Sequence, residues 1–153
     1  MEVHMGATVK DILNKKGSKV FSVNVNDTVF YALEVMADKN IGCVVVFDGD
    51  KIVGTFTERD YARKVILRGK SSKETKVGDL MNKDVLYVTP NDPVEECMAL
   101  MTAKKTRYLL VLDDNKLMGI ISIGDVLAQI ISDCRFTVRE LEKYITGDFG
   151  SVH

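Results

Sequence analysis

The sequence holds few of the side chains on which most enzymes and metal sites depend. Its only two histidines, His4 and His153, lie near the ends of the chain, and its three cysteines show no CxxC spacing. No Ser-His-Asp or Cys-His set can therefore be assembled from internal residues. A Walker loop and a strand followed by GxGxxG are also missing. We expect no catalytic residue, no metal site and no enzymatic activity.

The sequence also has no pattern that predicts disulfide bonds or a membrane-spanning segment. Cys43 and Cys97 lie in apolar stretches typical of buried free thiols, and with Cys134 they make an odd number, which indicates a reducing compartment. The N-terminal stretch MEVHMGATVKDIL lacks the apolar centre of a signal peptide. No apolar run approaches the roughly 18 residues that a membrane span needs. The sequence predicts a cytoplasmic protein without a membrane partner.

An excess of either charge is missing too. The formal net charge is −1, so no global field draws the chain to nucleic acid, and any anion site must be local. A basic stretch at 59–73 is most simply a solvated helix face. Phosphate binding is the next interpretation, and nucleic-acid binding follows both because aromatic residues are few there. Its cations are Arg59, Arg63, Lys64, Arg68, Lys70 and Lys73.

The chain does contain an internal repeat, in which one segment of the sequence occurs twice. The residues from Val20 align with those from Val85 at an offset of 65, with no gap as far as Ile66 and Ile131. Upstream, VKDIL at 9–13 matches VGDLM at 77–81, so each repeat also has a lead-in helix. Such self-similarity marks a duplicated structural unit. The identical pairs include Asn26/Asn91, Asp27/Asp92, Met36/Met101, Gly54/Gly119 and Asp60/Asp125.

Each repeat predicts the same order of elements. A short strand (FSVNV or LYVTP) leads to a helix capped by Asn-Asp, and an apolar run (CVVVF or YLLVL) predicts a buried strand. After a turn, KIVGTFT or KLMGIIS forms a strand that runs directly into a helix. The predicted fold is α/β (α+β), with two β-α-β-β-α repeats packed about a pseudo-twofold axis. The predicted boundaries are 8–66 for repeat 1, 67–76 for a linker, 77–132 for repeat 2, 133–147 for a C-terminal helix, and 1–7 and 148–153 for flexible termini.

The C-terminal segment FTVRELEKYITG places Val138, Leu141, Tyr144 and Ile145 along one helical face. This face either covers the module's own core or contacts another chain. The sequence leaves both alternatives open.

The doubled pattern resembles a known family. The Asn-Asp helix start, the VVVFDGD hairpin and the ending Gly-x-x-[Ser/Thr]-x-x-Asp are similar to those of the cystathionine-β-synthase (CBS) domain. Two copies in tandem resemble a stand-alone CBS pair over roughly residues 8–132. The resemblance implies a regulatory module that binds AMP, ADP, ATP, NAD(H) or S-adenosylmethionine, with AMP the first choice. It also implies a homodimer, often a flat disc of two modules, that signals to a target protein.

The most informative motif is a hydroxyl followed three residues later by a carboxylate, as in Thr57/Asp60 and Ser122/Asp125. This spacing is a variant of the capping box, whose contribution of about 0.5–2 kcal/mol explains it without a ligand. Its recurrence at equivalent positions favours a ligand site as well, because a helix N-terminus attracts phosphate. The resemblance implies that the aspartate binds ribose and the hydroxyl binds phosphate or sugar. Both interpretations are compatible.

The two copies differ in their positive donors. Arg59 in repeat 1 corresponds to Gly124 in repeat 2, whereas Arg107 in repeat 2 corresponds to Gly42 in repeat 1. The resemblance implies that a ligand held by one repeat's aspartate reaches donors of the other repeat. It therefore predicts a preferred site of Asp125, Thr57 and Arg59, and a weaker site of Asp60, Ser122 and Arg107.

Adenine would need an apolar slot beside backbone polar groups. The resemblance points to the approach to the first strand and the start of the next, with Lys19, Val20, Phe21, Ile41, Gly42 and Cys43. Core packing explains Val20 and Ile41 equally well, and Cys43 is a packed residue rather than a reactive thiol. The alternative function is a ligand-independent dimerisation or assembly module, followed by nucleic-acid binding through 59–73.

Overall fold

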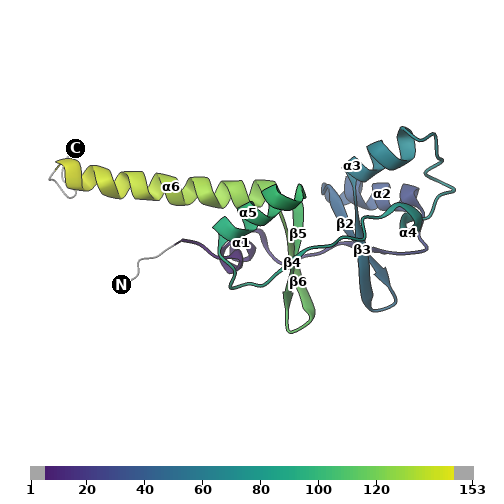
Figure 1. The fold of residues 1–153 in the computed structure, drawn as a ribbon, viewed down its shortest axis with the longest axis horizontal. Coiled ribbons are helices and arrows are strands. Elements are labelled where there is room, and N and C mark those ends of the chain that lie inside the picture. Colours follow the sequence, from purple (N-terminus) through teal and green to yellow (C-terminus); the bar gives the residue numbers. More distant parts are fainter. Residues whose placement is uncertain (1–5, 147–153) are drawn as a thin grey trace. The chain divides into compact units, whose positions relative to one another are not determined.

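A computed structural model describes residues 6–146, which form two compact units (Figure 1). The continuous unit is the segment 19–86, and the composite unit joins the described residues up to Ser18 to those from Tyr87 onward. Of the termini predicted to be flexible, residues 1–5 and 148–153 lie outside the described residues.

The continuous unit is built on a three-stranded mixed sheet. β1 pairs in parallel with β2, and β2 pairs antiparallel with β3, in the order β1-β2-β3. The apolar run of β2 is buried from Cys43 to Val46, which is why this strand shows no alternation of polar and apolar residues. The elements are β1 (Ser22–Asn24), α2 (Val29–Lys39), β2 (Cys43–Asp48), β3 (Lys51–Thr57), α3 (Glu58–Asp60), the π-helix η1 (Tyr61–Ile66) and α4 (Val77–Leu80).

The composite unit repeats this sheet with the same pairing, in the order β4-β5-β6. Even an irregularity recurs, because the register shifts after Val46 in β2 and after the equivalent Val111 in β5. The structure therefore confirms the duplicated α/β fold. The elements are α1 (Val9–Lys16), β4 (Tyr87–Val88), α5 (Val94–Lys104), β5 (Tyr108–Asp113), β6 (Lys116–Ser122) and α6 (Ile123–Thr146).

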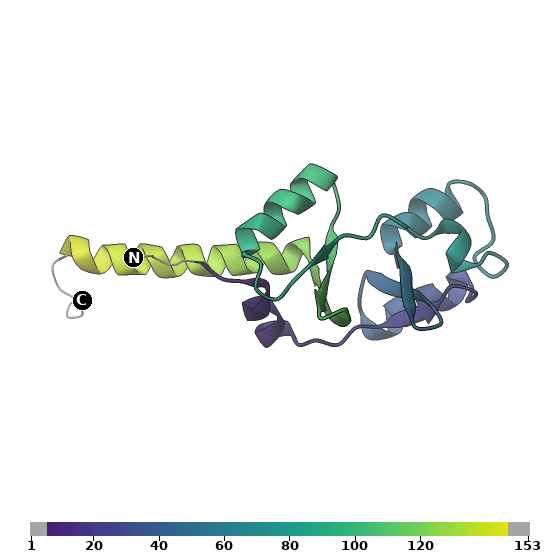
Figure 2. The same cartoon turned by 60° about the horizontal axis from the view of Figure 1, so that its bottom comes forward.

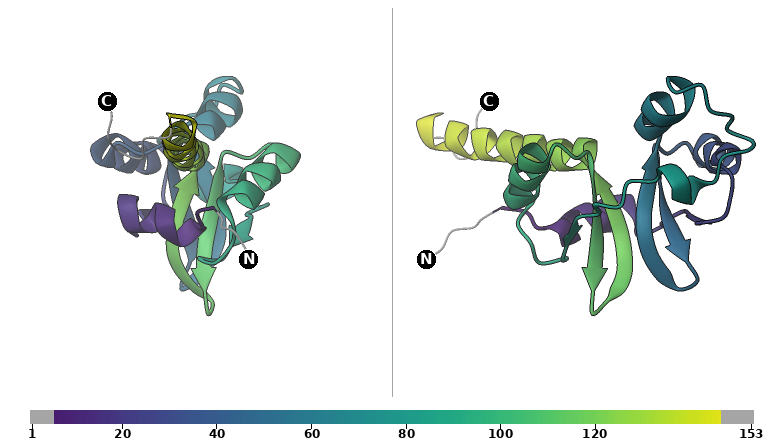
Figure 3. Two further views of the ribbon diagram at one scale, coloured as in Figure 1. Left: turned by 90° about the vertical axis from the view of Figure 1, so that its left-hand side faces the viewer. Right: turned by 45° about the vertical axis from the view of Figure 1, so that its right-hand side comes forward.

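The lead-in helices are exchanged between the repeats. α1 precedes repeat 1 in the sequence but lies in the composite unit, where Val9 N donates to Asp92 O at 2.9 Å (Figure 3). α4 precedes repeat 2 but lies in the continuous unit, where Val77 N donates to Asp27 O at 2.8 Å. The spatial units thus differ from the sequence repeats 8–66 and 77–132, and the predicted linker 67–76 leads into α4 within the continuous unit.

Two equivalent glycines allow these exchanged segments to approach the sheets. A Cβ atom at Gly54 in β3 would lie 2.7 Å from the backbone oxygen of Asn82, just after α4. A Cβ atom at Gly119 in β6 would lie 2.7 Å from Cδ2 of Leu13 in α1. The identical Gly54/Gly119 pair therefore marks where each lead-in segment packs.

The predicted Asn-Asp caps are wrong. Asp27 belongs to a turn in which its Oδ2 accepts a hydrogen bond from Asn24 N at 2.7 Å, so the helix begins after it. The N-cap of α2 is Thr28, whose side chain accepts from Tyr31 N. The N-cap of α5 is Pro93, which has no capping side chain. The Asn-Asp pairs order the turn before each helix instead.

The predicted C-terminal helix is the second half of α6, which begins at Ile123 without a break (Figure 1). Residue 147 lies outside the described residues. Val138, Leu141, Tyr144 and Ile145 are all exposed, so this half does not cover the core of its own chain. None of the helices within residues 6–146 is long and apolar enough to cross a membrane.

Candidate functional site

One edge of the β1-β2-β3 sheet gathers the predicted residues of repeat 1. The parallel strands β1 and β2 begin at this edge, and the antiparallel strand β3 ends there, with Cys43 paired to Thr57. Phe21 O accepts from Val45 N at 3.1 Å, which ties the approach to β1 to the same edge. The structure thus brings together the segments 19–21, 41–43 and 57–60.

Thr57 and Asp60 form the capping box that their spacing predicted. Thr57 Oγ1 accepts from Asp60 N at 3.0 Å, and Asp60 Oδ2 accepts from Thr57 N at 3.0 Å. The other carboxylate oxygen, Oδ1, lies 3.4 Å from Lys64 Nζ, one turn later. Lys64 Nζ also donates to Leu80 O at 3.1 Å, which joins this helix to α4. Both oxygens of Asp60 are therefore engaged within the continuous unit.

Ser122 and Asp125 repeat this arrangement at the start of α6. Asp125 Oδ2 accepts from Ser122 N at 2.8 Å, and Ser122 Oγ accepts from Asp125 N at 3.1 Å. Oδ2 of Asp125 also lies 2.7 Å from Nζ of Lys16, at the end of α1. Lys16 in turn donates to Ile120 O at 2.9 Å. The exchanged helix α1 thus supplies the cation for the Asp125 carboxylate.

The protonation of Asp125 reflects this setting. Burial raises the pKa of the Asp125 carboxyl, but the hydrogen bond and charge of Lys16 and the hydrogen bonds of Ser122 lower it more, so that the pKa lies below its ordinary value of 3.8. The carboxylate is half-buried and ionised at neutral pH. It is a fixed negative charge and hydrogen-bond acceptor at the edge of the composite sheet.

Lys16 was not predicted as a site residue from the sequence. In repeat 1 the cation comes from the same helix, four residues after Asp60, but the equivalent position in repeat 2 is Gln129. Gln129 is buried and donates to Asp133 instead. Repeat 2 has Gln129 where repeat 1 has Lys64. This difference was a signal in the sequence that the cation beside the Asp125 carboxylate comes from another helix.

The two predicted arginine donors are both exposed, Arg59 within α3 and Arg107 directly before β5. Gly42 O accepts from Glu58 N at 3.1 Å, and Arg107 O accepts from Ile123 N at 2.9 Å, which confirms that positions 42 and 107 correspond. Arg107 therefore lies beside the Ser122 end of β6 within one unit. The crosswise combination of residues from both repeats stays a prediction.

The predicted adenine slot contains residues with evident structural roles. Ile41 packs against the apolar core, Val20 is half-buried, and Cys43 is buried. Lys39 Nζ lies 5.3 Å from the ring centre of Phe21, a cation–π contact at the same edge. Core packing is therefore observed for Ile41 and Cys43, while Lys19 is exposed and available to a ligand.

The basic stretch 59–73 is partly used by the fold. Lys64 is paired with Asp60, and Lys73 Nζ lies 5.0 Å from the ring centre of Phe30. Arg59, Arg63 and the remaining cations are exposed. Among residues 6–146, no group of three or more His, Cys, Asp or Glu side chains could hold a metal ion.

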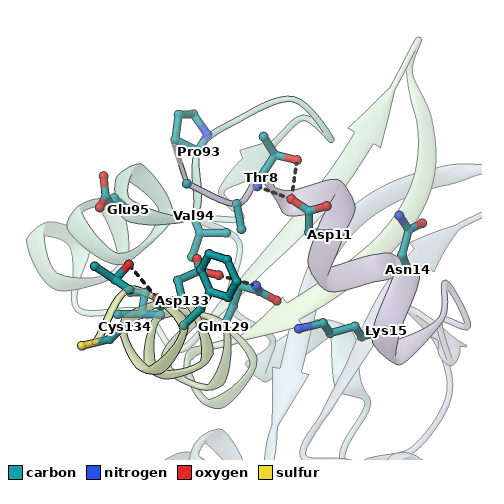
Figure 4. A pocket seen from close by; sticks show the side chains of 15 residues that line it. Thr8, Asp11, Asn14, Lys15, Pro93, Val94, Glu95, Gln129, Asp133 and Cys134 are labelled. Atoms are coloured by element: carbon teal, nitrogen blue, oxygen red, sulfur yellow. Dashed lines mark hydrogen bonds between the residues drawn. The ribbon is translucent and has the colours of Figure 1, made fainter. Parts of the chain in front are cut away.

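An open groove of about 1370 Å³, which the sequence did not predict, lies in the composite unit (Figure 4). It runs between the start of α1, the start of α5 and the middle of α6. Asp11 and Asn14 line it from α1, Glu95 from α5, and Asp133 and Phe136 from α6. None of the predicted ligand residues lines this groove, so it is separate from the helix-start carboxylates.

The fold and the two helix-start carboxylates define a duplicated α/β module. The CBS domain family matches residues 8–66 and 77–132, and the chain belongs to this family. It is a tandem CBS-domain protein of the regulatory and signal-transduction class.

Several known proteins are similar in sequence to most of this chain. The mitochondrial CBS domain-containing protein CBSX3 of Arabidopsis thaliana is 36% identical over 151 residues, which cover 93% of this chain and 73% of the relative. The CBS domain-containing protein YhcV of Bacillus subtilis is 28% identical over 127 residues, covering 83% and 88%. A solved structure described as a signal-transduction protein with CBS domains, from Burkholderia ambifaria, is 49% identical with a TM-score of 0.80, covering 83% and 96%.

These relatives consist of CBS domains and contain no catalytic domain. These relatives agree with the expectation that the chain is not an enzyme.

Proposed function

We propose that this chain is a sensor that binds an adenosine-containing ligand at the helix starts of its two repeats. AMP is the first candidate, followed by ADP, ATP, NAD(H) and S-adenosylmethionine. The observation that carries the proposal is the duplicated capping box of a CBS-family chain. It presents two partly buried carboxylates, Asp60 and Asp125, at the edges where the β-strands meet the helices.

In the preferred site, Asp125 accepts hydrogen bonds from the ribose hydroxyls while Thr57 and Arg59 bind phosphate. The fork of the exposed Arg59 suits a phosphate group because it can donate two parallel hydrogen bonds. A second, weaker site combines Asp60 with Ser122 and Arg107. Adenine would lie against Lys19, Val20, Phe21, Ile41, Gly42 and Cys43.

The hydrogen bonds of Asp125 suggest how the site opens. Both the Ser122 amide and Lys16 bind Oδ2, which leaves Oδ1 for a first ribose hydroxyl. A second hydroxyl that binds Oδ2 would displace Lys16, because one oxygen cannot accept three strong bonds at good geometry. The released ammonium would then be a donor to phosphate, so Lys16 adds to the donors predicted from the sequence.

The output of such a sensor is a change in conformation or assembly that a target protein detects. The ligand must bind one arrangement better than another, because equal affinity for both shifts nothing. A homodimer through the CBS repeats is the simplest assembly to change. One structural relative, a CBS-CP12 protein of bloom-forming cyanobacteria at 25% identity with a TM-score of 0.73, is hexameric.

The alternative is an assembly module that needs no ligand. The exposed apolar side chains of α6 favour it, since they offer a contact surface that does not depend on nucleotide. Nucleic-acid binding through 59–73 is a lesser alternative, because Lys64 and Lys73 are already engaged within the fold. A cytoplasmic location stays a prediction, and the Arabidopsis relative is a mitochondrial protein.

Binding is tested by thermal shift and calorimetry with AMP, ADP, ATP, NADH, S-adenosylmethionine and a short oligonucleotide. A ligand at a hundredfold excess over its Kd should stabilise the protein by about 2.7 kcal/mol. Asp125→Ala should weaken binding at least tenfold. Asp11→Ala is the matched control, because Asp11 forms a similar capping box with Thr8 outside the proposed site and its loss should leave affinity unchanged.

Two results would refute the sensor. One is no stabilisation by any adenosine ligand in protein shown to be free of co-purified nucleotide. The other is an equal affinity of wild type and Asp125→Ala for the ligand, which would show that Asp125 only caps the helix.

A further inference from the structure

A row of exposed apolar side chains follows α6 from its first half to its end. These residues, called here the α6 seam, are Leu127, Ile131, Cys134, Val138, Leu141 and Ile145. The side chains of Leu127, Ile131, Val138, Leu141 and Ile145 are 44–82% exposed, and Cys134 is also exposed. Single exposed apolar residues need no explanation, but a continuous row of six indicates a contact surface.

The spacing of the α6 seam has a period of 3.5 residues. Successive members are separated by four, three, four, three and four residues, which is the a/d pattern of a two-stranded coiled coil. The a positions hold Ile131, Val138 and Ile145, and the d positions hold Leu127, Cys134 and Leu141. In parallel coiled coils, β-branched residues at a with leucine at d favour two helices over three or four.

A hollow on the helix surface fits the same pattern. It has a volume of about 330 Å³ and is lined by Ile131, Cys134, Arg135 and Val138, together with Arg139. The first four residues stand at i, i+3, i+4 and i+7, the set that receives a side chain from a facing helix in knobs-into-holes packing. In a parallel pair, the side chain that enters this hole is the second copy's Cys134.

The charges beside the seam agree with a parallel orientation. Arg135 and Glu142 occupy e positions, while Thr137 and Tyr144 occupy g positions. Parallel pairing brings e near g, so no like charges meet. An antiparallel pair that used the whole seam would bring Arg135 close to Arg135 of the second copy. Electrostatic repulsion therefore disfavours that alternative.

We propose that α6 pairs in parallel with α6 of a second copy of this chain, over residues 127–145. The contact would be about 27 Å long at 1.5 Å per residue. The projecting half of α6, residues 133–146, is about as long as isolated helices that are marginal in water, so it gains stability from a partner (Figure 2). Leu127 and Ile131 belong to repeat 2 and the other four seam residues follow it, and the contact requires no nucleotide.

The first test measures assembly by sedimentation velocity on nucleotide-free protein. Leu141→Glu places a carboxylate in the paired seam and should raise the dimer Kd about a hundredfold or more. Phe136→Glu is the matched control, because Phe136 is 58% exposed, close to the 55% of Leu141, but lies on the groove side of the helix. It should leave the dimer intact. A monomeric wild type at tens of micromolar, or an assembly state that Leu141→Glu leaves unchanged, would overturn the proposal.

The second test fixes the orientation. In a parallel pair two Cys134 thiols face each other, and diamide should oxidise them to one disulfide while it is reduced to the hydrazine. Cys43 and Cys97 are buried, so Cys134→Ser should abolish the cross-link. A dimer that depends on Leu141 but does not cross-link through Cys134 contradicts the parallel arrangement. Because neither test contains nucleotide, their failure leaves the proposed binding of an adenosine-containing ligand unaffected.

Discussion

Nζ of Lys16 lies 2.7 Å from Oδ2 of Asp125, although 109 residues separate them in the chain. The pair joins the last residue of α1 to the first turn of α6 in the composite unit. It therefore couples the placement of an exchanged helix to the most important carboxylate of the proposed ligand site.

Lys16→Met should lower the free energy of unfolding at pH 7 by about 1 kcal/mol, because a partly buried ion pair and a hydrogen bond to Ile120 O are lost. Lys15→Met is the control, since Lys15 is an exposed neighbour on the same helix and should change little. Urea denaturation of both variants measures the difference. Equal effects would show that the Lys16–Asp125 pair does not stabilise the fold.

The Asp125 carboxyl also predicts a dependence on pH. Its pKa is lower in the folded protein than its ordinary value of 3.8, so the unfolded state binds the proton first as the pH falls. The stability from this group is present above that value and is lost as the pH falls from about 5 through 3.8 toward the folded pKa. Asp125→Asn should therefore lose less stability than wild type between pH 6 and pH 3, by urea denaturation at each pH. A parallel decline in both proteins would contradict the prediction.

Substitution by alanine should destabilise the fold more at Gly54 than at the equivalent Gly119. Gly54→Ala should cost about 2–3 kcal/mol, because the new Cβ meets the backbone oxygen of Asn82, which also accepts from Thr55 N. Gly119→Ala should cost less than about 1 kcal/mol, because its Cβ meets the end of the Leu13 side chain, which can turn away. Thermal and urea unfolding of both variants tests this order, and the reverse order would show that the backbone after α4 yields more easily than the Leu13 side chain.

Lys105 ends α5 with φ at 55°, a left-handed conformation that costs a lysine roughly 1 kcal/mol. Lys105→Gly should therefore stabilise the protein by about 0.5–1 kcal/mol. The equivalent residue of repeat 1 is Asn40, also at φ 55°, and asparagine tolerates this conformation better. Asn40→Gly should thus change the free energy of unfolding by less. If both variants gain equally, the strain is not specific to lysine.

Much of the fold could be predicted because the same pattern of strands and helices occurs in both sequence repeats. KIVGTFT and KLMGIIS are β3 and β6 to the residue, since an apolar strand that runs into a hydroxyl-capped helix has strong local signals. The capping pairs Thr57/Asp60 and Ser122/Asp125 were predicted for the same reason. The caps of α2 and α5 were not, because an Asp before a helix can order a turn as readily as a cap.

The exchange of lead-in helices could not be predicted from the repeat. Alignment shows that VKDIL and VGDLM are equivalent, but it cannot show on which sheet each one packs. The role of Lys16 follows from that exchange, so it was missed as well. Contacts between distant segments depend on tertiary packing, which leaves no local pattern in the sequence.

The exchange also orders events during synthesis of the chain. Residues 19–86 contain all the elements of the continuous unit, including α4, so this unit can begin to fold before the rest of the chain is made. α1 emerges before them, yet its partners in β6 and α6 are made last. The N-terminal segment therefore waits unpaired while the whole of residues 19–86 is translated. Closing this long loop costs only slightly more entropy than closing a short one, so the delay is one of time rather than of final stability.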